Sequence, residues 1–134
     1  MPLSSARRSQ LAAGATIIAI FLCVSSLTST ASTRDIARLA AILDNRLASL
    51  SVCIAYYTII KECSPRGEDT GAARVIEDLS AQSRTAADAL AMSSDEVALR
   101  LDINLSMQRQ LIEGSCSQIP VLSSRYADQC AGLR

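Results

Sequence analysis

The residues between Asp35 and Glu62 place apolar side chains at alternating steps of four and three, and this period constrains the fold more than any other feature of the chain. Such steps keep the apolar side chains on one face of an α-helix. Thr33 is placed to cap the start of this helix, and the breaker segment SPRG at 64–67 ends it. The stripe predicted to face the core is Ile36, Ala40, Leu43, Leu47, Leu50, Ile54 and Tyr57.

Three later segments also carry a helical period, and no segment shows the alternation of a strand. They are a second helix from Thr70 or Gly71 to Ala91, a third that is capped by Ser93 or Ser94 and stops at Gly114, and a last short helix that Pro120 opens or interrupts. One face of the second helix carries Ala72, Ile76, Leu79, Ala86 and Leu90. The third directs Val97, Leu101, Leu105 and Ile112 towards the core, and the last contains Val121, Leu122 and Tyr126. We therefore expect an all-α fold, a small antiparallel bundle of three to four helices.

Four cysteines follow residue 31, and their spacing tests this arrangement. Cys53 and Cys63 lie ten residues apart on the first predicted helix, which corresponds to about 15 Å along its axis. Cysteines that share a disulfide have Cα atoms within roughly 7 Å, so each of the two needs a partner from the C-terminal segment. In helices that alternate in direction, Cys63 meets Cys116 at one end and the returning chain brings Cys130 beside Cys53. The predicted disulfides are Cys53–Cys130 and Cys63–Cys116.

The first 31 residues have the order of a cleavable signal peptide. Arg7 and Arg8 precede an apolar run over residues 11–24, and small residues follow, with Ser29 and Ala31 suited to the −3 and −1 positions of a cleavage site. The predicted parts are therefore a signal peptide, residues 1–31, and a disulfide-braced helical domain, residues 32–134.

The alternative is that residues 11–31 stay in the chain as an inner-membrane anchor. A spanning helix needs roughly 20 mostly apolar residues, and the apolar run here contains fourteen. Export would place the domain in the periplasm or outside a bacterial cell, where four cysteines form two disulfides. The expected contact with the membrane is then only transient, through the signal peptide.

The chain lacks the residue patterns of common catalytic and ligand-binding sites. It contains no histidine, and its cysteines are separated by nine and thirteen residues, whereas zinc ligands usually have about two to four residues between them. The part after residue 31 has eleven basic and thirteen acidic residues with no charged block, which does not favour nucleic acid as a partner. We expect no enzyme activity, no metal and no cofactor. Arg100, Arg109, Asp102 and Glu113 are expected to form an exposed charged face.

Tyr56 is the candidate interface residue. Tyr57 falls in the predicted core stripe, and because neighbouring helix positions face different ways, Tyr56 is expected to lean towards the disulfide. Tyrosine is common at protein interfaces. Packing of Tyr56 in the core is the favoured interpretation, and a side chain that faces a partner is the alternative.

The segments CIAYYTIIKEC at 53–63 and CSQIPVLSSRYADQC at 116–130 resemble small exported proteobacterial proteins of uncharacterised function. The shared features are a C-x-x-Y-Y run and a C-terminal Cys…Tyr…Cys pattern, here Cys53, Tyr56 and Tyr57, then Cys116, Tyr126 and Cys130. The resemblance covers most of residues 47–133. It implies export and a helical fold, and it implies no activity.

A small, cross-linked helical domain without catalytic groups is suited to binding. The predicted function is a non-catalytic exported binding module, with another extracytoplasmic protein as partner. One form of it is an inhibitor or immunity-type protein that blocks an enzyme. The alternative is a small-ligand carrier in the periplasm, with a gap between alanine-lined helices as its pocket.

Overall fold

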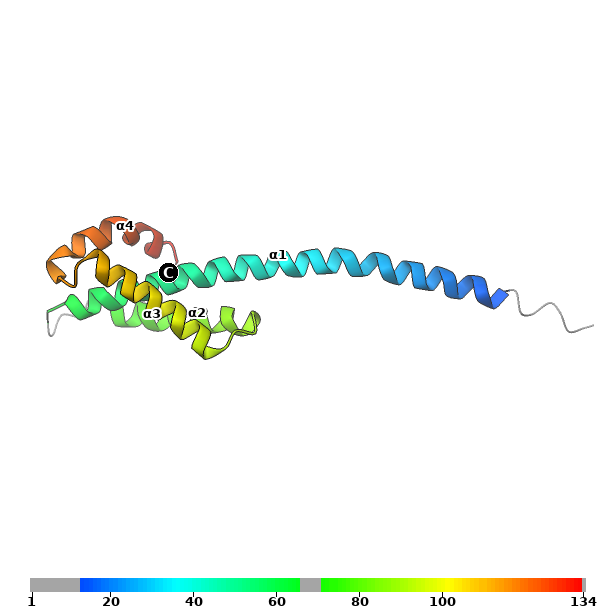
Figure 1. The fold of residues 1–134 in the computed structure, drawn as a ribbon, viewed down its shortest axis with the longest axis horizontal. Helices are drawn as coiled ribbons and strands as arrows, with labels where there is room; N and C mark the ends of the chain where they lie inside the picture. The colour runs from blue at the N-terminus through cyan, green and yellow to red at the C-terminus, as the bar shows by residue number, and fades with distance from the viewer. Residues whose placement is uncertain (1–12, 66–70, 134) are drawn as a thin grey trace, which may run out of the picture. The chain divides into compact units, whose positions relative to one another are not determined.

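The computed structural model is all-α (Figure 1). It describes the backbone of residues 13–65 and 71–133 and the side chains of residues 33–65 and 71–133. Its elements are α1 (Ala13–Cys63), α2 (Ala72–Ala89), α3 (Ser94–Leu111), the short 3-10 helix η1 (Cys116–Gln118) and α4 (Ile119–Ala131). The chain divides into two units, of which the first ends at Leu39 and the second begins at Ala40. In the second unit α1 to α4 alternate in direction, which confirms the predicted antiparallel bundle (Figure 1).

Helix α1 begins upstream of the predicted start. The prediction that Thr33 caps it is wrong, because Thr33 lies inside α1 and no glycine or proline interrupts residues 15–63. Residues 13–32 are described as helical backbone alone. The predicted signal peptide, residues 1–31, therefore lies outside the residues whose side chains are described, and it stays a prediction.

The apolar stripe of α1 forms core only in its later part. Leu47 and Leu50 have no exposed surface and Ile54 is 6% exposed, whereas Ile36 is 65% exposed. Helices α2 and α3 have 18 residues each and span about 27 Å. The part of α1 from Ile36 to its end at Cys63, which contains the apolar stripe, extends about 40 Å. The shorter helices are not long enough to cover the whole stripe, so the prediction that Ile36 is a core residue is wrong.

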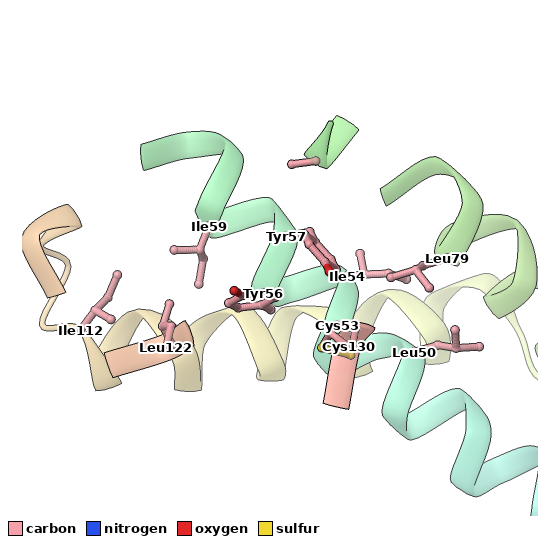
Figure 2. Close-up of a cluster of buried hydrophobic side chains, with 11 residues drawn as sticks. Leu50, Cys53, Ile54, Tyr56, Tyr57, Ile59, Leu79, Ile112, Leu122 and Cys130 are labelled. Carbon is pink, nitrogen blue, oxygen red and sulfur yellow. A yellow bond between two sulfur atoms is a disulfide. The ribbon is translucent and has the colours of Figure 1, made fainter. Parts of the chain in front are cut away.

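All four helical segments of the bundle contribute to one core (Figure 2). Leu79 of α2 and Leu122 of α4 are fully buried, and Ile112, which ends α3, is 2% exposed. This confirms Ile112 as a core position and the predicted apolar face of α2 that carries Leu79. Burial of large apolar side chains is the main stabilising term of such a domain, at roughly 1.5–3 kcal/mol for each side chain.

The segment Thr33–Cys63 is long and apolar enough, by length and composition, to cross a membrane, and it is the single such segment among the described residues. Of its most apolar window, 39% is buried within the protein. Leu47 and Leu50 lie in this segment and are fully covered by the bundle. Core packing therefore accounts for Leu47 and Leu50, whereas Ile36, Leu39 and Ile42 of the same segment are exposed.

The two disulfides have the predicted pairing. Cys53 bonds Cys130 with Cα atoms 5.3 Å apart, and Cys63 bonds Cys116 with Cα atoms 5.4 Å apart. Both separations lie in the usual range for disulfides. The pairing is nested because α4 returns antiparallel to α1, so its C-terminal part lies beside Cys53 and its start lies beside Cys63 at the end of α1.

Candidate functional site

Helix α3 carries the candidate surface, and its start is set by a capping box. The Ser93 hydroxyl accepts a hydrogen bond from the Glu96 backbone N–H (3.3 Å), and the Glu96 carboxylate accepts one from the Ser93 backbone N–H (2.8 Å). The hydrogen bonds from Ser93 lower the pKa of Glu96 below its ordinary value of 4.5, since they stabilise the charged carboxylate. Of the two predicted caps, Ser93 is therefore the one used.

The end of α3 is a tight left-handed turn. Glu113 and Gly114 have φ angles of 50° and 68°, and their backbone N–H groups donate to the carbonyls of Gln110 and Arg109, each at 3.0 Å. This pair of bonds satisfies carbonyls at the end of the helix. The predicted stop at Gly114 is correct, although the left-handed conformation already begins at Glu113. The turn directs the chain into η1.

The outer side of α3 presents three large apolar side chains to solvent. Leu99 is 60% exposed, Ile103 49% and Met107 60%. They lie at steps of four, so they form a continuous row along the helix, of the kind that packs into the groove of another helix. We call these three residues the α3 ridge. The other exposed large apolar side chains among the described residues are Ile36, Leu39, Ile42 and Val121.

The inner side of α3 contains a buried amide. Gln108 is 2% exposed, and its Nε2 donates a hydrogen bond to the backbone carbonyl of Val52 in α1 (2.9 Å). Its Oε1 is buried and accepts no hydrogen bond from the described protein groups. Sequence reasoning missed this residue. The signal was its position, because Gln108 fills the gap between Leu105 and Ile112 on the predicted core face.

Two ion pairs fasten α3 to α1. Arg100 binds Asp44 at 2.8 Å, and Arg109 binds Glu62 at 2.8 Å. The four side chains are between 36% and 52% exposed, so each pair contributes only about 0–1 kcal/mol. The predicted charged face is therefore not a set of free surface charges, because Arg100 and Arg109 both form ion pairs with carboxylates of α1. Together with the buried inner face, the pairs keep the α3 ridge directed away from the core.

A shallow depression of about 650 Å³ runs beside the α3 ridge. It is lined by Asp102, Ser106, Arg109, Gln110, Glu113 and Gly114. Asp102 and Ser106 directly precede Ile103 and Met107 in the helix, so the depression borders the ridge on one side. A smaller depression of about 300 Å³ lies on α2 and is lined by Val75, Asp78, Leu79, Ala81 and Gln82.

Tyr56 lies in the core, which agrees with the favoured interpretation and not with the alternative of a side chain that faces a partner. It is 6% exposed, and its ring contacts those of Tyr57 and Tyr126 at centroid distances of 5.0 and 6.3 Å. Its hydroxyl shares a hydrogen bond of 3.3 Å with the hydroxyl of Ser123 in α4. The Cys53–Cys130 disulfide holds α4 over this face of α1, and α4 therefore covers Tyr56.

The described residues were also compared with the requirements of a metal site, and the chain with known proteins. In residues 33–65 and 71–133, no group of three or more histidine, cysteine, aspartate and glutamate side chains is placed to hold a metal ion. Comparison with protein-family models, with curated proteins and with solved structures gave no match. The candidate binding surface is therefore the exposed apolar side of α3.

Proposed function

We propose that this chain is an exported, non-catalytic protein-binding module and that the α3 ridge is its binding surface. The observation that carries the proposal is the exposure of Leu99, Ile103 and Met107 on a helix whose inner side is packed and whose ends are capped. Large apolar side chains gathered on one exposed face mark interaction sites more often than isolated ones do. Binding would remove them from water.

Export is supported by the cysteines and by the leader together. Both disulfides form among the four cysteines that follow the predicted cleavage site after Ala31. Structural disulfides persist in oxidising compartments. A periplasmic or secreted location follows from cleavage, and an inner-membrane form anchored by residues 11–31 would expose the same bundle to the same compartment.

The charges around the α3 ridge favour a protein partner with a basic rim. Asp95 and Asp102 are exposed beside the ridge, while Arg100 and Arg109 are already paired with carboxylates of α1. The rim of the ridge is therefore acidic on balance, and it would repel nucleic acid and anionic lipid headgroups. We infer an apolar groove flanked by arginine or lysine on the partner. In the inhibitor or immunity-type form of this proposal, that groove belongs to an enzyme.

The carrier alternative has weaker support. The depression on α2, at about 300 Å³, is at the lower limit of pockets that hold small molecules. The larger depression is lined mainly by charged and polar side chains, and it is open to solvent. Neither is the large, enclosed apolar cavity that a carrier needs.

Site-specific photo-cross-linking in the source bacterium tests the proposal. A photoreactive phenylalanine analogue at Ile103 should give one discrete adduct with an envelope protein, and the same analogue at Gln129, an exposed position of α4, should give none. With that partner purified, Ile103→Glu should weaken binding about 30-fold, as expected for loss of an apolar anchor. Gln129→Glu should leave the affinity unchanged.

Three results would overturn the proposal. The first is the absence of any adduct at Ile103, and the second is an adduct of equal yield at Gln129. The third is an adduct whose only other component is a second copy of the chain. Circular dichroism of both variants checks that the fold is intact, which is expected because both positions are exposed.

A further inference from the structure

The two disulfides differ in their access to solvent. Cys53 and Cys130 have no exposed surface. Cys116 is exposed and Cys63 is half-buried. The covalent bonds therefore divide into an inner disulfide, Cys53–Cys130, which crosses the core, and an outer disulfide, Cys63–Cys116, which lies at the surface.

Access decides which disulfide can exchange with external thiols. Exchange requires a thiolate to approach one sulfur in line with the bond and to expel the other. At the outer disulfide the exposed residue Cys116 offers that approach in the folded protein. At the inner disulfide the surrounding side chains of α1 and α4 block it until the bundle opens.

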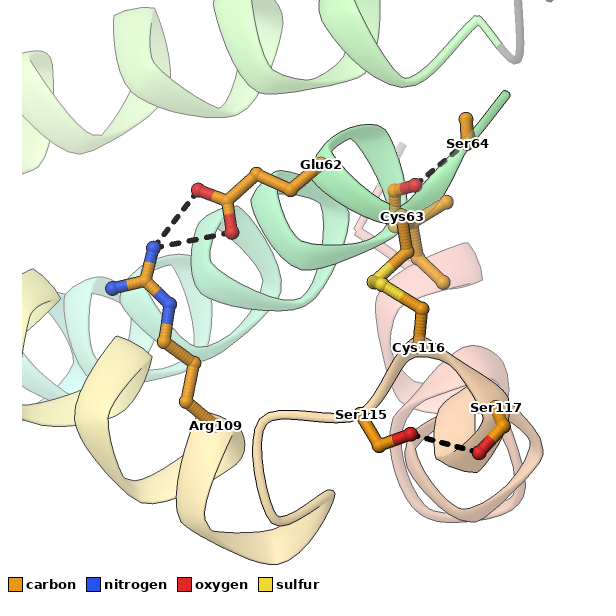
Figure 3. Close-up of a disulfide and its surroundings, with 8 residues drawn as sticks. Glu62, Cys63, Ser64, Arg109, Ser115, Cys116 and Ser117 are labelled. Atoms are coloured by element: carbon orange, nitrogen blue, oxygen red, sulfur yellow. Dashed lines mark hydrogen bonds and ion pairs between the residues drawn. A yellow bond between two sulfur atoms is a disulfide. The ribbon is translucent and has the colours of Figure 1, made fainter. Parts of the chain in front are cut away.

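The outer disulfide is one of two neighbouring links that connect the end of α1 to other segments (Figure 3). Consecutive residues of α1 hold different segments, because Glu62 pairs with Arg109 of α3 and Cys63 bonds Cys116 at the start of η1. The ion pair is about half exposed on both sides, and salt screens such a pair. Ile112 is held in the core, so reduction of the outer disulfide would free the turn at residues 113–118, which follows it, from its covalent link to α1 and leave the weak, salt-sensitive Arg109–Glu62 pair beside it.

We propose that Cys63–Cys116 is a thiol-exchange site that accepts electrons from a dithiol, while Cys53–Cys130 keeps the bundle folded. A thiolate of the dithiol attacks Sγ of Cys116, the S–S bond breaks, and its electron pair leaves on Sγ of Cys63, which takes up a proton. The second thiol of the reagent then attacks the mixed disulfide, releases the Cys116 thiol and closes the reagent's own disulfide. Two electrons and two protons pass from the dithiol to the chain. The proposal is independent of the α3 ridge.

Timed reduction of the oxidised protein with dithiothreitol under native conditions tests the order. Samples are quenched with iodoacetamide, and intact mass and peptide mapping identify the alkylated cysteines. The first product should carry two alkyl groups, on Cys63 and Cys116, and reduction of Cys53–Cys130 should be at least about 100-fold slower, since it waits for opening of the core. In concentrated guanidinium chloride the two rates should come within a few-fold of each other. Equal rates under native conditions, or alkylation of Cys53 and Cys130 first, would overturn the proposal.

Hydrogen exchange and a protein reductant test the consequence and the source of electrons. Amides of residues 113–118 should exchange faster after selective reduction, and those around Cys130 should not. Unchanged exchange at 113–118 would contradict the loosening of this turn. The same experiment with a reduced thioredoxin-like oxidoreductase in place of dithiothreitol identifies the electron donor. Reduction of Cys63–Cys116 by both reagents indicates that a protein dithiol is the donor. Reduction by dithiothreitol alone indicates a small-molecule dithiol.

Discussion

Replacement of Gln108 by methionine should stabilise the protein, although it removes a hydrogen bond. Gln108 is 2% exposed, its Nε2 donates to the Val52 carbonyl at 2.9 Å, and its Oε1 has no partner among the described protein groups. A buried acceptor without a hydrogen bond costs about 1–3 kcal/mol, whereas the bond from Nε2 contributes about 1 kcal/mol. Methionine has nearly the same length and adapts to the same space. The expected gain is about 1 kcal/mol.

Urea unfolding followed by circular dichroism, with both disulfides intact, measures this change. In thermal unfolding, the same gain of about 1 kcal/mol corresponds to a rise in Tm of about 4–8 °C for a domain of this size. Gln110→Met is the matched control, because Gln110 is an exposed residue of the same helix and reports any change in helix propensity alone. Gln108→Ala should instead lose about 2–3 kcal/mol, since it leaves a cavity.

The reasoning is refuted if Gln108→Met lowers the free energy of unfolding by about 1 kcal/mol or more while Gln110→Met does not. That result would show that the amide is fully satisfied in the folded protein and stabilises it. The packing of α3 against α1 would then depend on this polar contact.

Four further predictions concern single residues. Ala91→Gly should raise the free energy of unfolding by about 0.5–1 kcal/mol in urea melts, because Ala91 directly follows the C-cap of α2 with a φ of 52°, which glycine adopts without the penalty of a Cβ. Ser93→Ala should lower it by about 1 kcal/mol in the same assay, through loss of the capping box at α3. Because the pKa of Glu96 is lowered in the folded state, its contribution is present above its ordinary value of 4.5 and is lost as the pH falls through the lower folded value. Below the ordinary pKa of 4.5, the free energy of unfolding of Glu96→Gln should therefore depend less on pH than that of the unmodified protein, as measured by urea unfolding at a series of acidic pH values. Leu122→Ala should cost about 2–5 kcal/mol in urea melts, because Leu122 has no exposed surface, and a loss below 1 kcal/mol would contradict its place in the core.

The disulfide pairing could be predicted because local geometry excludes the alternatives. A helix that contains both Cys53 and Cys63 keeps them too far apart to bond, and alternation of helix direction then selects one partner for each. For Tyr56, local reasoning left a choice between core packing and contact with a partner. Neighbouring positions on an isolated helix do face different ways, but the face of Tyr56 is covered by α4, and that cover depends on a contact 67 residues away in the chain.

Periodicity also predicted which face of α1 is apolar but not how far it is covered. Ile36 continues the stripe of Leu47 and Leu50, yet it is exposed, because coverage depends on the lengths of the other helices. For the α3 ridge, the helical period was present in the sequence, but it did not show that these residues are exposed. Leu99, Ile103 and Met107 follow a helical period of their own, and they become a surface feature only once Leu105 and Ile112 are known to face the core.

The measurement that tests the account most directly is the mass of the protein from the native envelope fraction, alkylated without prior reduction. The account predicts a chain that begins at or near Ser32 and carries no alkyl group, which would establish both cleavage after Ala31 and two disulfides in the cell. A full-length chain with alkylated cysteines would contradict it, because the protein would then retain its leader and keep its thiols reduced.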